Sequence, residues 1–86
     1  MNQKIYQLYH DKEHGILKVS PMHSSFNNCG IDKALAQHPE DYLFFYNSYH
    51  YFSYSRKALV ELARKMKEEW IQQLEMKLEI YKNIKI

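Results

Sequence analysis

The side chains with the greatest capacity for chemistry are one cysteine, Cys29, and five histidines: His10, His14, His23, His38 and His50. Imidazole and thiolate are the usual ligands of zinc. The chain has no Cys-x-x-Cys pair, however. The two histidines four residues apart, His10 and His14, fall across an expected strand end and loop rather than along one helix face. The spacing therefore favours dispersed polar histidines, and we expect neither a metal site nor a cofactor.

Nucleophilic and acid–base catalysis have equally little support. Cys29 precedes Gly30 in an expected loop, but a nucleophile needs a base and an orienting group that this spacing does not supply. The paired acids at 40–41 follow a proline in a loop, and those at 68–69 lie on a polar helix face, where solvated charge is the ordinary role. The only glycines, Gly15 and Gly30, stand too far apart for a phosphate-binding loop. We expect no enzyme.

Aromatic residues are concentrated in one short stretch. Of the thirteen (eight Tyr, four Phe, one Trp), eight lie between Tyr42 and Tyr54. On a sheet, alternate rings should point inward, and the outward tyrosines would form a patch of the kind used to bind proteins. The residues predicted to bind a partner are these tyrosines and two neighbouring basic residues: Tyr42, Tyr46, Tyr49, Tyr51, Tyr54, Arg56 and Lys57.

The same cluster has an alternative interpretation as a platform for single-stranded nucleic acid. Bases would stack on the rings while Arg56 and Lys57 follow the phosphates. The net charge is only +2, and the helix that follows alternates basic and acidic residues at i,i+4, which should neutralise its polar face. The expected pairs are Glu61 with Lys65, Arg64 with Glu68, and Lys65 with Glu69. Protein binding is therefore favoured over nucleic-acid binding.

A single long helix, residues 53–82, should organise the rest of the chain. Its apolar residues recur every three or four positions without Gly or Pro, and Ser53 or Ser55 would cap its first turn. About 28 helical residues would span about 42 Å, which exceeds what a compact chain of this size needs. Its distal apolar face comprises Trp70, Ile71, Leu74, Leu78 and Tyr81. This face could form a homodimer through antiparallel helices, or the sheet and the tail 84–86 could fold over it.

The segments before the helix favour strands and turns. Residues 4–10 and 16–20 predict a hairpin around a polar loop, and residues 22–30 form a loop. Residues 42–46 and 49–52 flank a turn at 47–48, either as a second tight hairpin or as one regular strand with a bulged approach to the helix. One face of the sheet would pack on the helix and the other would face water or a partner.

Two helix ends are also predicted. Asp32 could cap a short helix that ends before Pro39, so that the helix lies near 32–37. Asn83 could adopt the left-handed conformation after the long helix, with Ile84 folding back on the last turn. The predicted class is thus α+β. It consists of an antiparallel sheet of three or four strands with an N-terminal hairpin, packed on one long C-terminal helix, in a single domain spanning 1–86.

These features predict a non-catalytic protein-binding module. A single cysteine and the lack of an apolar leader or membrane span favour the cytoplasm, without membrane association. In general type, a short, aromatic-rich chain without catalytic motifs resembles the small phage or mobile-element inhibitors of host defence enzymes, including anti-CRISPR proteins. The resemblance implies a host protein or protein complex as the partner, and host cytoplasm as the location.

Overall fold

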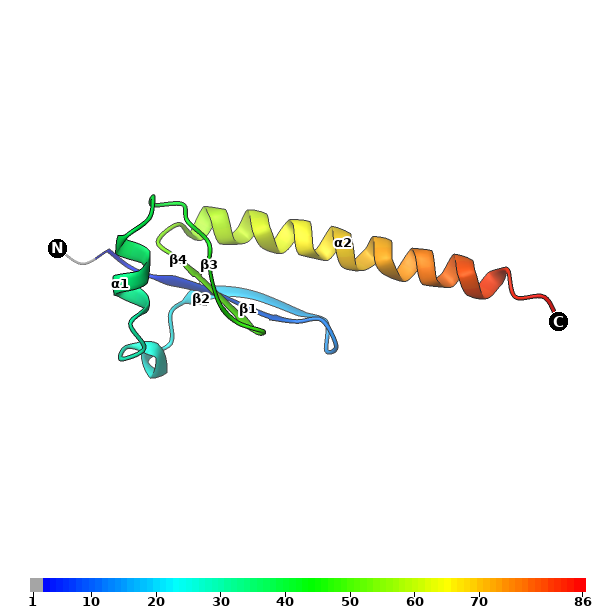
Figure 1. The fold of residues 1–86 in the computed structure, drawn as a ribbon, viewed down its shortest axis with the longest axis horizontal. Helices are drawn as coiled ribbons and strands as arrows, with labels where there is room; N and C mark the ends of the chain where they lie inside the picture. The colour runs from blue at the N-terminus through cyan, green and yellow to red at the C-terminus, as the bar shows by residue number, and fades with distance from the viewer. Residues whose placement is uncertain (1–2) are drawn as a thin grey trace.

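The computed structural model describes residues 3–86 and shows an antiparallel sheet with one long helix lying across it (Figure 1). The strands are β1 (Tyr6–Asp11), β2 (Ile16–Pro21), β3 (Phe44–Asn47) and β4 (His50–Ser53). The helical elements are the short 3-10 turn η1 (Ser24–Phe26), α1 (Ile31–Ala36) and α2 (Arg56–Lys82). The predicted α+β class, the N-terminal hairpin, the short helix and the long C-terminal helix are all confirmed.

The sheet has the strand order β2-β1-β4-β3, so the first and last strands of the chain form its centre. Tyr6 pairs with Ser53 at one end of the central ladder, and every neighbouring pair is antiparallel. Of the two alternatives for residues 42–52, the tight hairpin is correct. Its turn is fixed by the Asn47 side chain, which accepts a hydrogen bond from the Tyr49 N–H at 2.9 Å. A bulge between Phe45 and Asn47 interrupts the ladder.

One face of the sheet carries α2, which packs against β1, β2 and β4. Leu8, on that face, and Leu59 of the helix are both fully buried. Of the two predicted caps, Ser55 is the N-cap, and its Oγ accepts from the Ala58 N–H at 3.1 Å. Ser53 is itself fully buried and accepts from the Ser55 N–H at 3.0 Å, which fixes the entry into the helix.

The other face of the sheet is partly covered, which corrects the expectation that it would face water or a partner. Ile31 and Leu35 of α1 and Phe52 of β4 form a buried cluster on this face. Half-buried residues complete the cluster: Ile5, Met22, Phe26, Tyr42, Phe44 and Tyr54. The connection between β2 and β3 therefore supplies a second core of its own, because α1 and η1 cover apolar side chains that α2 cannot reach.

Both predicted helix ends need correction. The short helix begins at Ile31, and its N-cap is Gly30 in the left-handed conformation (φ 75°), so Asp32 lies inside the first turn rather than capping it. Glycine reaches this conformation without the steric cost that a Cβ brings. Asn83 is not left-handed: it has φ −90° and ψ 4°, and its N–H donates to the carbonyls of Glu79 and Ile80. The long helix thus ends without a left-handed residue.

The molecule is elongated because α2 is longer than the sheet on which it lies. The overall dimensions are 64 × 23 × 18 Å, and the radius of gyration is 16.5 Å, compared with about 12 Å expected for a compact chain of this length. The 27 residues of α2 span about 40 Å, and its C-terminal part extends past the strands (Figure 1). Across residues 3–86, no helix is both long enough and apolar enough to cross a membrane.

Candidate protein-binding surfaces

The distal part of α2 and the tail form a projecting segment, defined as residues 71–86, in which every residue is exposed. The segment begins where the hairpin of β1 and β2 ends. There Lys12 donates to the side-chain oxygen of Gln73, and Trp70 is still half-buried. Strands of six residues reach only about 20 Å, whereas α2 reaches about 40 Å, so the sheet cannot cover the whole helix.

The projecting segment carries an apolar stripe along one side of the helix. The exposed fractions of its members are 46% for Ile71, 60% for Leu74, 48% for Leu78 and 63% for Tyr81. The tail does not fold over them: Ile84 and Ile86 are themselves exposed. The alternative in which the sheet and residues 84–86 cover this face is therefore wrong. Such a row of large apolar side chains on a helix is what a helix-binding surface on another protein would bury.

The five predicted tyrosines divide into two groups. Tyr46 and Tyr49 are exposed. Tyr42 stacks on His38 with a centroid distance of 3.7 Å, and Tyr51 packs between His10 and Phe45, at 5.3 and 5.1 Å. The half-buried Tyr54 hydroxyl donates to the backbone and side-chain oxygens of Asp32, both at 3.3 Å. Burial and then the Asp32 carboxylate raise the pKa of Tyr54. Tyr54 therefore fastens α1 to the start of α2.

Tyr46 and Tyr49 lie near two rings that are outside the predicted partner-binding set, Tyr9 and Phe26. Tyr9 lies 6.3 Å from Tyr49 and 5.4 Å from His50, measured between ring centroids. Tyr46 packs edge-on against Phe26 at 5.9 Å. The pairing of β1 with β4 brings Tyr9 opposite His50, and only knowledge of that register could have placed Tyr9 in the group.

The basic residues predicted to act with the tyrosines lie elsewhere. Arg56 and Lys57 occupy the first turn of α2, which follows the C-terminal end of β4, whereas Tyr49 precedes its N-terminal end (Figure 1). The basic residue that lies beside these exposed rings is Lys18 of β2, which is paired with Tyr9 of β1. The structure therefore does not combine Arg56 and Lys57 with the exposed rings into one continuous nucleic-acid platform.

The charges on α2 are also arranged differently from the prediction. Among residues 3–86, the one side-chain pair at ion-pair distance is His14 with Asp11, at 2.8 Å. None of the expected i,i+4 pairs on α2 comes within 4.0 Å, because these long exposed side chains gain little from being held in one geometry. Arg64 is therefore available to other charged groups, and so is its neighbour one turn on, Lys67.

The histidines and Cys29 have local contacts. Burial, and secondarily the charge of His50, lowers the pKa of His10; burial alone lowers that of His50. Burial acts to raise the pKa of Asp11, but hydrogen bonds from His14 outweigh it and lower the pKa. A hydrogen bond with the exposed Cys29 raises the pKa of Tyr46. Across 3–86, no three His, Cys, Asp or Glu side chains converge as metal ligands.

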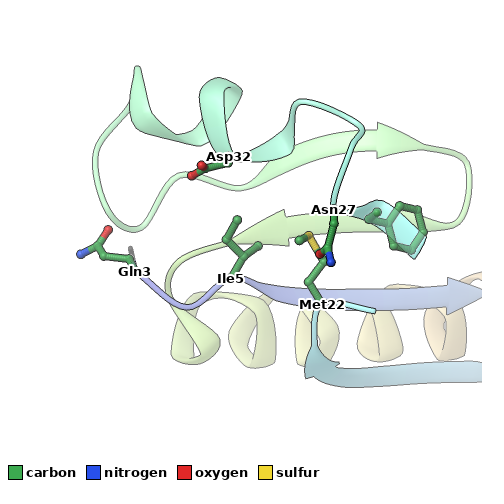
Figure 2. Close-up of a pocket in the computed structure, with 6 residues that line it drawn as sticks. Gln3, Ile5, Met22, Asn27 and Asp32 are labelled. Atoms are coloured by element: carbon green, nitrogen blue, oxygen red, sulfur yellow. The ribbon is translucent and has the colours of Figure 1, made fainter. Parts of the chain in front are cut away.

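A small pocket of about 190 Å³ opens between the start of β1, the loop before α1 and α1 itself (Figure 2). Its apolar part is made by Ile5, Met22 and Phe26, and its polar part by Gln3, Asn27 and Asp32. The volume is below the roughly 300–1,000 Å³ of pockets that enclose small molecules. Asp32 already accepts the hydrogen bond from Tyr54. This hollow is thus a less developed surface than the projecting segment.

No protein-family model matches the chain, and no curated protein or solved structure is significantly similar to it. The fold and surfaces define a small α+β chain whose most exposed apolar surface lies on a projecting helix.

Proposed function

We propose that the chain is a non-catalytic protein-binding module that engages its partner through the projecting segment of α2. The observation that supports this proposal is the apolar stripe of Ile71, Leu74, Leu78 and Tyr81, which no other part of the described chain covers. Fully burying one such side chain contributes about 1.5–3 kcal/mol. Burying the exposed halves of four would therefore contribute several kcal/mol to a complex.

The geometry favours a partner that can enclose a helix. The projecting segment is separated from the sheet along most of its length, so a groove or a second helix can reach the stripe without meeting the strands (Figure 1). Two copies packed antiparallel through this segment would be one such complex, because the two sheets would then lie at opposite ends. Inhibition of a host defence enzyme, the narrower role predicted from the sequence, stays a prediction that identification of the partner would test.

Two variants with equal changes in charge test the proposal. Leu74→Glu with Leu78→Glu places two carboxylates in the stripe, whereas Gln72→Glu with Met76→Glu places two on the opposite side of the same helix. All four positions are exposed, so both variants should fold with the stability of the parent chain. Thermal unfolding monitored by circular dichroism checks this requirement.

The readouts are sedimentation equilibrium of the purified chain and affinity capture from host lysate with and without nuclease. We expect either self-association or a stoichiometric captured protein, with affinity at least tenfold weaker in the stripe variant and unchanged in the control. A partner held equally well by both variants would contradict the proposal. Capture that disappears with nuclease would instead indicate nucleic-acid binding.

A further inference from the structure

The outer strand β2 has backbone groups that no other strand uses. In residues 3–86 it pairs only with β1, at one edge of the sheet. The Met22 N–H donates to the Ile5 carbonyl, so these two opposite residues form a hydrogen-bonded pair between the two strands. Along an antiparallel ladder, such pairs alternate with pairs whose backbone groups point away from the partner strand. The alternation directs the N–H and C=O of Leu17 and Val19 away from β1. This edge can therefore accept one more strand.

An apolar groove runs beside the same edge, between β2 and α2. It has a volume of about 260 Å³ and is lined by Leu17, Val19, Val60, Ala63, Arg64 and Lys67. Leu17 and Val19 thus offer outward backbone groups while their side chains line the groove. A strand added to β2 would have alternate side chains directed toward this groove, because side chains alternate between the two faces of a sheet.

The charge around the edge has one sign on both faces of the sheet. Arg64 and Lys67 border the groove on the α2 side, and neither forms an ion pair within the described chain. Lys18, which stands between Leu17 and Val19 along β2, is exposed on the opposite face of the sheet. A segment bound here would meet basic side chains above and below its backbone.

From these observations we infer that β2 binds an extended acidic segment of another protein as a fifth strand. Apolar side chains of that segment enter the groove, and carboxylates beside them on the same face meet Arg64 and Lys67. Carboxylates on the opposite face of the added strand meet Lys18. Pairing of β2 with a second copy is disfavoured, because antiparallel pairing centred on Lys18 would place two lysines directly opposite each other. This surface is distinct from the stripe on the projecting segment, so the inference does not depend on the proposed function.

The probe is the capped heptapeptide Asp-Glu-Val-Glu-Val-Glu-Asp, added at millimolar concentration to the full chain; its like charges keep it monomeric at neutral pH. With its valines toward the groove, its two Asp residues lie on the same face, toward Arg64 and Lys67, and its Glu residues lie on the face of Lys18. We expect amide chemical-shift changes confined to β2 and residues 60–67. Hydrogen exchange at the Leu17 and Val19 amides should slow about tenfold when the peptide is at ten times its dissociation constant, because only the unbound fraction exchanges. The heptapeptide Lys-Lys-Val-Lys-Val-Lys-Lys, with the same pattern and the opposite charge, is the control and should produce neither effect.

Charge-reversal variants test whether the peptide binds at the edge of β2. Arg64→Glu with Lys67→Glu reverses two exposed charges at the groove and should weaken peptide affinity at least tenfold. Lys82→Glu with Lys85→Glu makes the same change in charge far from β2 and should leave the affinity unchanged, as should Leu74→Glu with Leu78→Glu. The inference is overturned if the basic peptide binds equally well, if the acidic peptide does not bind, or if the Leu17 and Val19 amides remain unprotected in the complex.

Discussion

At the scale of single residues, His10 is the polar side chain whose environment fits it least. Its ring lies 5.3 Å from that of Tyr51, and its Nε2 atom is buried without a hydrogen-bond partner in the described chain. Burial lowers its pKa, as it does for His50 on the same pair of strands. A buried nitrogen left unpaired costs about 1–3 kcal/mol, which offsets part of the stability that the His10 ring gains by packing.

The lowered pKa values predict loss of stability in acid. The unfolded chain binds protons at these histidines as the pH falls below about 6.5, whereas the folded chain resists protonation until lower pH. The free energy of unfolding should therefore decrease as the pH falls from about 7.5 to about 5.5. Urea unfolding at the two pH values measures the change, and stability that stays constant or rises would contradict it.

His10→Phe provides the matched substitution for this prediction. It removes the unpaired nitrogen and keeps a ring against Tyr51, so it should raise stability near neutral pH by about 1 kcal/mol and reduce the acid sensitivity. The same change at the exposed His38, which would keep the stack on Tyr42, removes no buried unpaired nitrogen and should not raise the stability by this amount.

At the scale of elements, α1 depends on the conformation of one residue before it. Gly30 caps the helix with φ 75°, and no heavy atom would lie within 4 Å of a Cβ added there. The cost of substitution is therefore conformational. Gly30→Ala should destabilise the fold by about 1–2 kcal/mol, whereas Gly30→Asn should cost less because asparagine tolerates the left-handed region better. Chemical denaturation of the two variants tests the order, and equal stability would contradict it.

The sequence was most informative about elements with a clear period or turn chemistry. The spacing from Leu59 to Tyr81 predicted α2, and Ser55 was one of the two residues predicted to cap it. Which tyrosines are exposed could not be predicted, because the bulge between Phe45 and Asn47 sets the side of the sheet to which Tyr46 turns. Tyr46 packs against Phe52, in the cluster that α1 covers.

The candidate surfaces were predictable only in part, for the same reason. The apolar stripe could be predicted from helical spacing alone. The edge of β2 and its groove could not, because both depend on β1 pairing with β4, which leaves β2 outermost and beside α2. Side-chain alternation within one segment does not reveal which strand becomes an edge. The approach of Tyr9 to Tyr49 depends on the same long-range pairing.

At the scale of the whole molecule, the half of α2 that packs on the sheet should be more stable than the half that projects. Leu59 is fully buried, whereas every residue after Trp70 is exposed, and isolated helices shorter than about 12–15 residues are marginal in water. Amide hydrogen exchange should therefore be slow around Leu59 and at least a hundredfold faster beyond Leu74. Equal protection of the backbone amides along the whole of α2, in the chain without a partner, would contradict this expectation.

The central position of β4 also affects how the chain is made. Tyr6 pairs with Ser53, so the two inner strands are separated by most of the sequence that precedes α2. At about 5–20 residues per second, a ribosome takes roughly 2–9 s to proceed from one to the other. During that interval β1 and β2 have no third strand to pair with, and a two-stranded hairpin is marginal by itself. Leu8 then has neither β4 nor α2 to bury it, so the nascent chain exposes its central apolar residue until both elements have been made.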